Sequence, residues 1–196
     1  MIKGMKLEEL TLEQCEQVRI WRNDCMESLR TPYMLTAEQQ AAFYRDTVCN
    51  RDARSRWWAV MIPEGSKTKN TKITDMPLGY DIEYISGFVG MVGLENIEWE
   101  NGCAEISIMF APWARGLGLG EQALHLLLEQ GFLYMRLDEI WGECYVCNPA
   151  LKFWHRMVDK YHAKTAILPR RKYWNGSKFD SFYFSISKEV YMKCHG

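Results

Sequence analysis

The stretch Ala111–Phe132, "APWARGLGLGEQALHLLLEQGF", sets the frame for the rest of the chain. Alternating glycines follow an arginine and lead directly into a run with helical apolar spacing. Glycines let a backbone approach a ligand closely, and the unpaired amides and dipole of a helix start favour an anion there. The spacing fails the GxGxxG dinucleotide pattern, and no Lys-Ser/Thr follows as in a nucleotide P-loop. The stretch predicts a diphosphate site to which Arg115 adds a permanent charge, and the alternative is an ordinary strand-to-helix turn with an exposed arginine.

Length and composition predict a single globular domain and exclude several partners. The chain has 196 residues, of which 47% are hydrophobic and 25% charged, as in one ordinary domain with its own core. The net charge of −1, with scattered lysines and arginines, disfavours nucleic-acid binding. No apolar run approaches the roughly 20 residues that span a bilayer, and the N-terminus lacks a signal-peptide core. We therefore expect a cytoplasmic chain that does not bind membranes.

The cysteines are interpreted as reduced thiols. Seven is an odd number, and a chain of this size does not need disulfides for stability. Cys144 and Cys147 have CxxC spacing, but they lie in the apolar run "IWGECYVC" without further zinc ligands. A metal or redox role is disfavoured, and no metal is predicted.

The remaining sequence predicts a mixed α/β order. Thr11 and Thr36 each start a helix with a glutamine three residues later, the capping-box spacing, and these helices should end near Asn23 and Cys49. Asn148 should cap a later helix, with Pro149 in its first turn. Further elements are a helix at 118–134 and strands at 56–62, 85–97, 103–111, 138–146 and, as one strand or two, 178–192.

Two connections stand out between these elements. Residues 63–84 are polar and rich in lysine, proline and glycine, which predicts a mobile insertion. Asn101-Gly102 is a strong hairpin signal, so the strands on either side of it should pair antiparallel. The prediction is one domain over 1–196 with an antiparallel front half and a strand-helix-strand unit behind it.

The sequence around the glycine loop resembles that of a known family. "ARGLGLG" behind the strand "AEISIMFAP" is similar to the R/Q-x-x-G-x-G/A signature of the GNAT superfamily of N-acetyltransferases. The segments "IWRN" and "YWNGSKFDSFYFSI" resemble relatives that acetylate spermidine, ribosomal-protein N-termini or amino sugars. The resemblance implies a GNAT fold, whose mixed central sheet splays between the fourth and fifth strands, and acetyl-CoA as co-substrate. It also implies that the loop holds the pyrophosphate and that the preceding strand runs beside pantetheine. The coenzyme A residues are then Ile108, Met109, Phe110, Arg115, Gly116, Leu117, Gly118, Leu119, Gly120 and Asn148, with Phe153 and Trp154 on the next helix.

The chemistry of acetyl transfer requires a proton acceptor for the amine and a proton for the leaving thiolate. Glu105 is the candidate base, because strand alternation puts it on one face with Ser107 and burial makes a carboxylate more basic. The alternative is a half-exposed strand glutamate without a catalytic role. The family often places an acid tyrosine after the helix asparagine, but that position holds His155 or Trp154 here. His155 and Tyr161 are the candidate acids, although His155 is also explained as a solvated helix residue.

Three function hypotheses follow. The first is acetyl transfer from acetyl-CoA to a primary amine of a small molecule, either an amino sugar or a polyamine-like compound, with Trp21, Arg22 and Asn23 at the acceptor wall. The second is a protein N-terminal or lysine acetyltransferase. The third is a catalytically silent acyl-CoA-binding module, which the missing tyrosine permits. Homodimerisation is left open.

Overall fold

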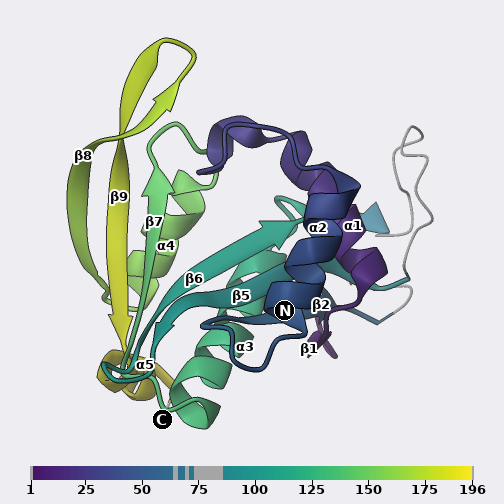
Figure 1. Ribbon diagram of the computed structural model, residues 1–196. Helices are drawn as coiled ribbons and strands as arrows, with labels where there is room; N and C mark the ends of the chain where they lie inside the picture. The colour runs from purple at the N-terminus through teal and green to yellow at the C-terminus, as the bar shows by residue number, and fades with distance from the viewer. Residues whose placement is uncertain (1, 64–65, 69–70, 73–85, 196) are drawn as a thin grey trace.

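A twisted seven-stranded sheet forms the centre of the molecule, with α1 and α2 on one face and α3 and α4 on the other (Figure 1). The computed structural model describes residues 2–63, 66–68, 71–72 and 86–195. The strand order in the sheet is β1-β2-β5-β6-β7-β9-β8. The strands of this sheet are β1 Lys6–Glu9, β2 Arg56–Met61, β5 Phe88–Glu98, β6 Cys103–Phe110, β7 Glu139–Tyr145, β8 Lys164–Trp174 and β9 Ser177–Ser187.

Helices separate β1 from β2, β6 from β7 and β7 from β8, and one helix follows β9. The α-helices are α1 Leu12–Asn23, α2 Ala37–Phe43, α3 Leu119–Glu129, α4 Leu151–Lys160 and α5 Lys188–His195. Short 3-10 turns occur at η1 Met26–Ser28 and η3 Pro112–Ala114, and π-helical turns continue α2 and α3 as η2 Tyr44–Val48 and η4 Gln130–Tyr134. No described helix has the length and apolarity needed to cross a bilayer.

The two predicted capping boxes are confirmed. Thr11 accepts a hydrogen bond from the Gln14 amide while the Gln14 side chain accepts one from the Thr11 amide. Thr36 and Gln39 do the same at the start of α2. The first helix ends at Asn23 as predicted. These short motifs are read correctly because both partners lie within one turn of chain.

The sheet is antiparallel except where β6 and β7 meet. The β6–β7 ladder is parallel and covers only three pairs, from Cys103 opposite Glu139 to Glu105 opposite Trp141. Beyond Glu105, β6 stays paired with β5 to Phe110, whereas β7 stays paired with β9 to Tyr145. The predicted splay between the fourth and fifth strands of the sheet is therefore confirmed.

Antiparallel pairing around Asn101-Gly102 is also confirmed, as is the core face of α3. Gly102 has φ +64°, in the left-handed region that the turn requires. Ala123, Leu124, Leu127 and Leu128 of α3 are fully buried, as their helical spacing predicts.

Other predictions are corrected at the ends of elements. Asn148 is not the cap of α4, because the cap is Ala150 and the helix begins at Leu151, three residues after Asn148; Asn148 Oδ1 instead accepts from the amide of Ala150 at 2.8 Å. The segment 188–192, predicted as strand, belongs to α5, whose Val190 amide donates to Ser187 Oγ. Two strands, β1 and the edge strand β8, were not predicted. The strand β8 is largely exposed, basic and interrupted by a register shift between Leu168 and Lys172, which explains why its sequence shows no strand signal.

The predicted insertion is only partly described. Within 63–84, β3 Lys67–Thr68 and β4 Thr71–Lys72 form a short antiparallel ladder. The prediction of mobility falls mostly on residues outside those that the structure describes.

Candidate active site

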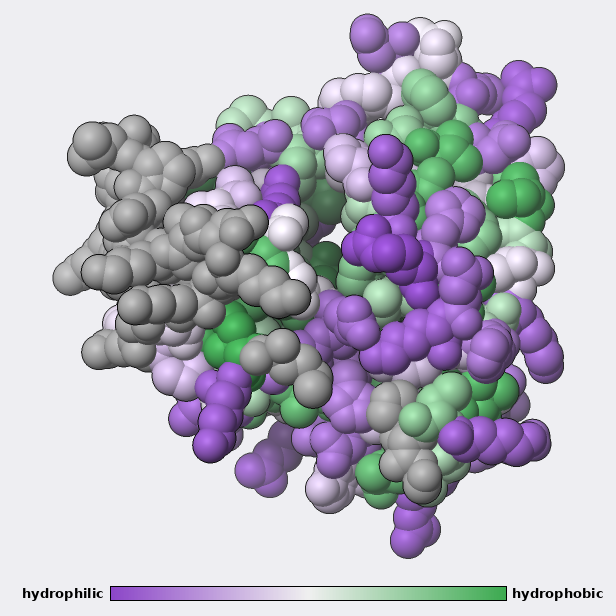
Figure 2. Space-filling view, turned by 180° about the vertical axis from the view of Figure 1, so that it is seen from behind, coloured by the Kyte–Doolittle hydropathy of each residue, from purple (hydrophilic) through white to green (hydrophobic). Residues whose placement is uncertain are grey.

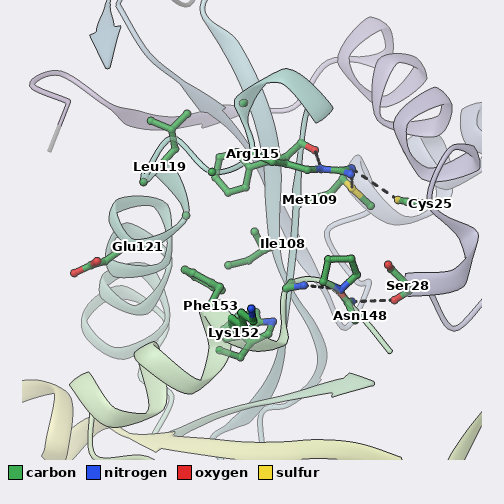
Figure 3. A pocket seen from close by; sticks show the side chains of 18 of the residues that line it. Cys25, Ser28, Ile108, Met109, Arg115, Leu119, Glu121, Asn148, Lys152 and Phe153 are labelled. Carbon is green, nitrogen blue, oxygen red and sulfur yellow. Dashed lines mark hydrogen bonds between the residues drawn. The ribbon is translucent and has the colours of Figure 1, made fainter. Parts of the chain in front are cut away.

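A cavity of about 480 Å³ lies at the splay (Figure 3). Its walls come from the segment after α1, the end of β6, the glycine loop with the first turn of α3, and the start of α4. Ile108 and Phe110 project from one face of β6 and Met109 from the other, yet all three line the cavity. The cavity therefore passes through the sheet at the splay. Seen from behind, the surface is hollowed near its centre, with hydrophobic atoms inside and hydrophilic atoms around the rim (Figure 2).

The structure brings nearly all the predicted coenzyme A residues to this cavity. The lining includes Ile108, Met109, Phe110, Arg115, Gly116, Gly118, Leu119, Gly120, Asn148, Phe153 and Trp154. Leu117 is the exception, because its side chain packs against the hydrophobic core. Sequence reasoning missed Cys25, Ser28 and Leu29, which reach the cavity from the segment after α1.

The glycine loop forms an open cradle at the N-terminus of α3. Gly116 and Gly118 have φ +76° and +80°, and a Cβ added at either would meet no atom within 4 Å. Gly118 is the left-handed residue that directly precedes the helix, so the first amides of α3 have no side-chain cap. Gly120 instead packs against the ring of Phe153, which joins α3 to α4. The backbone is thus accessible at a position where the helix dipole favours an anion.

Arg115 bends over the mouth of this cavity. Its Nε donates to the carbonyl oxygen of Phe110 at 3.2 Å, and one Nη lies 3.8 Å from both Cys25 Sγ and Met109 Sδ (Figure 3). Among the described residues it forms no salt bridge. The guanidinium charge is therefore available to an anionic ligand in the cradle.

Asn148 connects the start of α4 to the opposite wall. Its Nδ2 donates to the carbonyl oxygen of Ser28 at 3.2 Å, and its Oδ1 accepts from Ala150 (Figure 3). The residue thus joins β7 and α4 to the segment after α1. An open glycine cradle, an uncapped helix start and an arginine that forms no salt bridge with the described residues lie in one cavity and fit the pyrophosphate and pantetheine arm of coenzyme A.

Glu105, the last residue of β6 that pairs with β7, forms an ion pair on the face of the sheet covered by α1 and α2. The guanidinium group of Arg30 donates to both oxygens of Glu105, one contact measuring 3.1 Å, and Asn96 Nδ2 donates to Glu105 Oε2 at 2.8 Å. The Glu105 side chain is only 6% exposed. Both oxygens of the Glu105 carboxylate are therefore occupied by hydrogen-bond donors. This arrangement opposes the prediction that Glu105 is the base.

Arg30 also reaches across the splay to β7. Its Nη2 lies 3.3 Å from Glu143, which accepts as well from Arg171 Nε at 3.1 Å and from Ser181 Oγ at 2.5 Å. Burial alone would raise the pKa of Glu143, but the hydrogen bonds from Arg171 and Ser181 and the two arginine charges hold that pKa below its ordinary value.

Glu95, which sequence reasoning missed, lies directly opposite Glu105 in the β5–β6 ladder. Burial raises its pKa, and the negative charge of Glu105 adds to this, while a hydrogen bond from Ser107 and the charges of Arg30 and Arg22 oppose it. The signal available in the sequence was its place at the end of the apolar run "FVGMVGLE", across the Asn101-Gly102 turn from Glu105.

The three residues predicted to form the acceptor wall, Trp21, Arg22 and Asn23, have different positions in the structure. Trp21 is a core residue, stacked on Phe88 with ring centroids 5.4 Å apart. Arg22 is partly buried, and burial lowers its pKa while the charge of Glu95 opposes this. Asn23 exchanges two hydrogen bonds with the backbone of Leu35, of 2.9 and 3.0 Å, which closes the segment 24–35 into a loop.

Neither predicted acid lines the cavity. Tyr161 is fully buried at the end of α4, where it stacks against Tyr191, and burial raises its pKa. His155 is exposed on α4, with its ring 4.4 Å from that of Phe182. Tyr161 belongs to the core because its position continues the apolar stripe of the helix. The structure does not support either residue as the proton donor.

Lys172 of β8 fastens the loop 24–35 from the other side. Its Nζ donates to the carbonyl oxygen of Leu29 and lies between the rings of Tyr145 and Trp174, with centroid distances of 5.5 and 5.2 Å. Lys172 is only 4% exposed. Backbone carbonyl and aromatic faces compensate the burial of its charge.

With the geometry established, comparisons define the class of protein. The model of the acetyltransferase (GNAT) domain family matches residues 5–152, so the chain belongs to the GNAT acetyltransferases, which transfer acetyl groups from acetyl-CoA to amines. A comparison with curated protein sequences gives no significant match.

Solved structures with the same fold narrow the comparison further. Spermidine N-acetyltransferase from Vibrio cholerae in complex with CoA and spermine is 18% identical, with a TM-score of 0.75 over 96% of this chain and 98% of that one. A dodecameric form of the Vibrio cholerae enzyme is 17% identical, with a TM-score of 0.73 over 98% of both chains. Such identities establish a shared fold.

Proposed function

We propose that the chain transfers an acetyl group from acetyl-CoA, held in the cavity at the splay, to a primary amine of a small polyamine-like molecule. One observation carries this proposal: the cavity crosses the sheet. On the side of α3 and α4 it ends at the glycine cradle. On the side of α1 it is lined by Cys25, Ser28 and Leu29, and the next residue, Arg30, contacts Glu105 and Glu143. A donor held at the cradle and an amine held on the opposite face would meet at the splay.

The donor side is assigned to backbone amides and one side chain. Gly116 and Gly118 leave room for the pyrophosphate, the first turn of α3 supplies unpaired amides, and Arg115 supplies the countercharge. Beyond Glu105, peptide groups of β6 that face β7 have no ladder partner, so one of them can donate to the thioester oxygen.

The acceptor side is assigned to the face covered by α1 and α2. Alternation along β7 places Trp141, Glu143 and Tyr145 on that face. Carboxylates bind an ammonium group, and aromatic rings pack against its methylene groups or face its charge. The spermine complex of the Vibrio cholerae relative supports an acceptor of this chemistry.

The charges on this face favour a second candidate for the acceptor, a molecule with one amine and no other charge, such as an amino sugar. Arg30 pairs with Glu105 and Glu143, Arg171 pairs with Glu143, and Arg22 lies near Glu95. The cations therefore offset the carboxylates, and a polycation gains less from this face than from an unpaired acidic one.

The test is an acceptor screen that measures free thiol released from acetyl-CoA. The panel contains spermidine, spermine, glucosamine, an N-terminal peptide and a lysine peptide, and calorimetry measures the binding of coenzyme A separately. Turnover of spermidine or spermine supports the polyamine proposal, and turnover of glucosamine alone supports the second candidate. Turnover of peptides alone contradicts both. Binding without thiol release from any amine indicates an acyl-CoA-binding module instead of an enzyme.

A further inference from the structure

The face that would receive the amine carries Glu95 and Glu105 as direct neighbours, and their surroundings differ. They are opposite partners in the β5–β6 ladder, so both side chains leave the sheet on the face covered by α1. A single proton acceptor is sufficient for the proposed transfer. The contacts of each carboxylate decide which of them is available.

Glu105 is engaged on both of its oxygens. Arg30 donates to each oxygen, and Asn96 adds a further bond to Oε2. Asn96 reaches Glu105 because the ladder contains an irregularity between Glu95 and Glu98, where Asn96 has φ +49°. These partners occupy both oxygens of the Glu105 carboxylate.

Glu95 has the opposite arrangement. On the same face of the neighbouring strand, Ser107 lies two residues beyond Glu105 and next to the cavity-lining Ile108. The Glu95 side chain is half-buried, with part of its surface open. No described arginine or lysine forms a salt bridge with it.

We propose that Glu95 accepts the proton of the incoming ammonium group, directly or through one water, and that Arg30 and Asn96 hold Glu105 out of that role. This inference rests on the proposed acetyl transfer. The ammonium group gives one proton to the Glu95 carboxylate, and the freed amine forms a C–N bond with the thioester carbon as the C–S bond breaks. The second proton of the attacking nitrogen goes to the departing sulfur, and Glu95 releases its proton to solvent.

The electrostatics of the site agree with this role. The groups that face Glu95 are Arg22 from α1, Arg30 from the loop, and Glu105 and Ser107 from β6, while β2 places the ring of Trp57 against Gly93 beside it. Burial and the charge of Glu105 raise the pKa of Glu95 above its ordinary value, which suits a base that works near neutrality.

The test measures the pH dependence of turnover with the most active amine of the panel. Glu95→Gln should lower kcat by roughly a hundredfold to ten-thousandfold and remove the acid limb of the kcat/KM profile, with acetyl-CoA binding unchanged. Ser107→Ala removes a hydroxyl group that lowers the pKa of Glu95, so the acid limb should move to higher pH. Glu98→Gln, an exposed glutamate on the same strand, is the matched control and should keep both turnover and profile.

Three results would overturn the inference. If the wild type is active and Glu95→Gln keeps near-full turnover and the acid limb, Glu95 is not the proton acceptor, while the proposed acetyl transfer still stands. A flattened acid limb in Glu105→Gln, with the limb kept in Glu95→Gln, returns the role to Glu105. A wild-type chain that releases no thiol with any amine removes the proposed function and this inference together, and is recognised before any variant is made.

Discussion

Arg30 and Glu105 form a bidentate ion pair at the point where β6 and β7 diverge, with the carboxylate buried and the guanidinium group half-exposed. Arg30 comes from the loop 24–35 and touches Glu143 of β7 through the same group. One side chain thus fastens the loop to both strands that form the splay. In the proposed mechanism Arg30 is a positioning residue.

Removal of Arg30 should destabilise the fold. Arg30→Ala leaves a buried carboxylate without its cation, and because Arg30 is half-exposed we expect a loss of about 1–3 kcal/mol in the free energy of unfolding, less than for a fully buried pair. Urea unfolding measures this. The control is Arg54→Ala, whose partner Glu100 is exposed like Arg54 itself, and its effect should stay within about 0.5 kcal/mol. Equal losses in the two variants would contradict a structural role for the Arg30 pair.

Gly118 should be required for the binding of coenzyme A. Gly118→Ala places a methyl group in the open cradle, and the loss of one or two amide contacts to phosphate should weaken binding by roughly 10- to 100-fold. Gly176→Ala is the matched control, because Gly176 has nearly the same φ (+79°) and equal space in the β8–β9 turn. Both variants carry the same backbone strain, so only the effect on calorimetric affinity separates them. Unchanged affinity in Gly118→Ala would sink the assignment of the loop.

Arg115 should contribute mainly through its charge. Arg115→Ala is expected to weaken coenzyme A binding about tenfold, the size of one charge-assisted hydrogen bond, and Arg115→Lys should recover part of the loss. The affinity of the wild type should fall more steeply with salt than that of Arg115→Ala. Identical salt dependence would show that Arg115 does not face the ligand.

Acid should destabilise the protein partly through Glu143. Its pKa in the folded state lies below 4.5, the ordinary value, so its contribution to stability is complete above about pH 4.5 and is lost as the pH falls through the lower folded value. Glu143→Gln should lower stability at neutral pH and flatten the decline of the unfolding midpoint between pH 5 and pH 3. A decline as steep as that of the wild type would place the acid sensitivity elsewhere.

The fold and the donor side could be predicted because their signals are local. Capping boxes, the Asn101-Gly102 turn and the glycine loop each depend on residues within a few positions of one another. The acceptor side depends on distant contacts: Arg30 meets Glu105 over 75 positions, and Lys172 meets Leu29 over 143. Strand alternation placed Glu105 on the correct face, but it could not show which partners would occupy its oxygens. The same reason explains why Glu95 and Ser28 went unnoticed.

The loop 24–35 has a consequence for the order in which substrates bind. Cys25, Ser28 and Leu29 line the donor cavity, while Arg30, the next residue, contacts the acceptor face. A donor that orders the first part of this short segment also orders the second, so the two substrates should bind with positive cooperativity, and linkage requires the effect to be equal in both directions. The dissociation constant of the amine, measured by calorimetry, should therefore fall when coenzyme A saturates the cavity, and the kinetics should favour donor before acceptor. In Asn23→Ala, which loses the contacts that close the loop, this cooperativity should diminish while each substrate still binds alone.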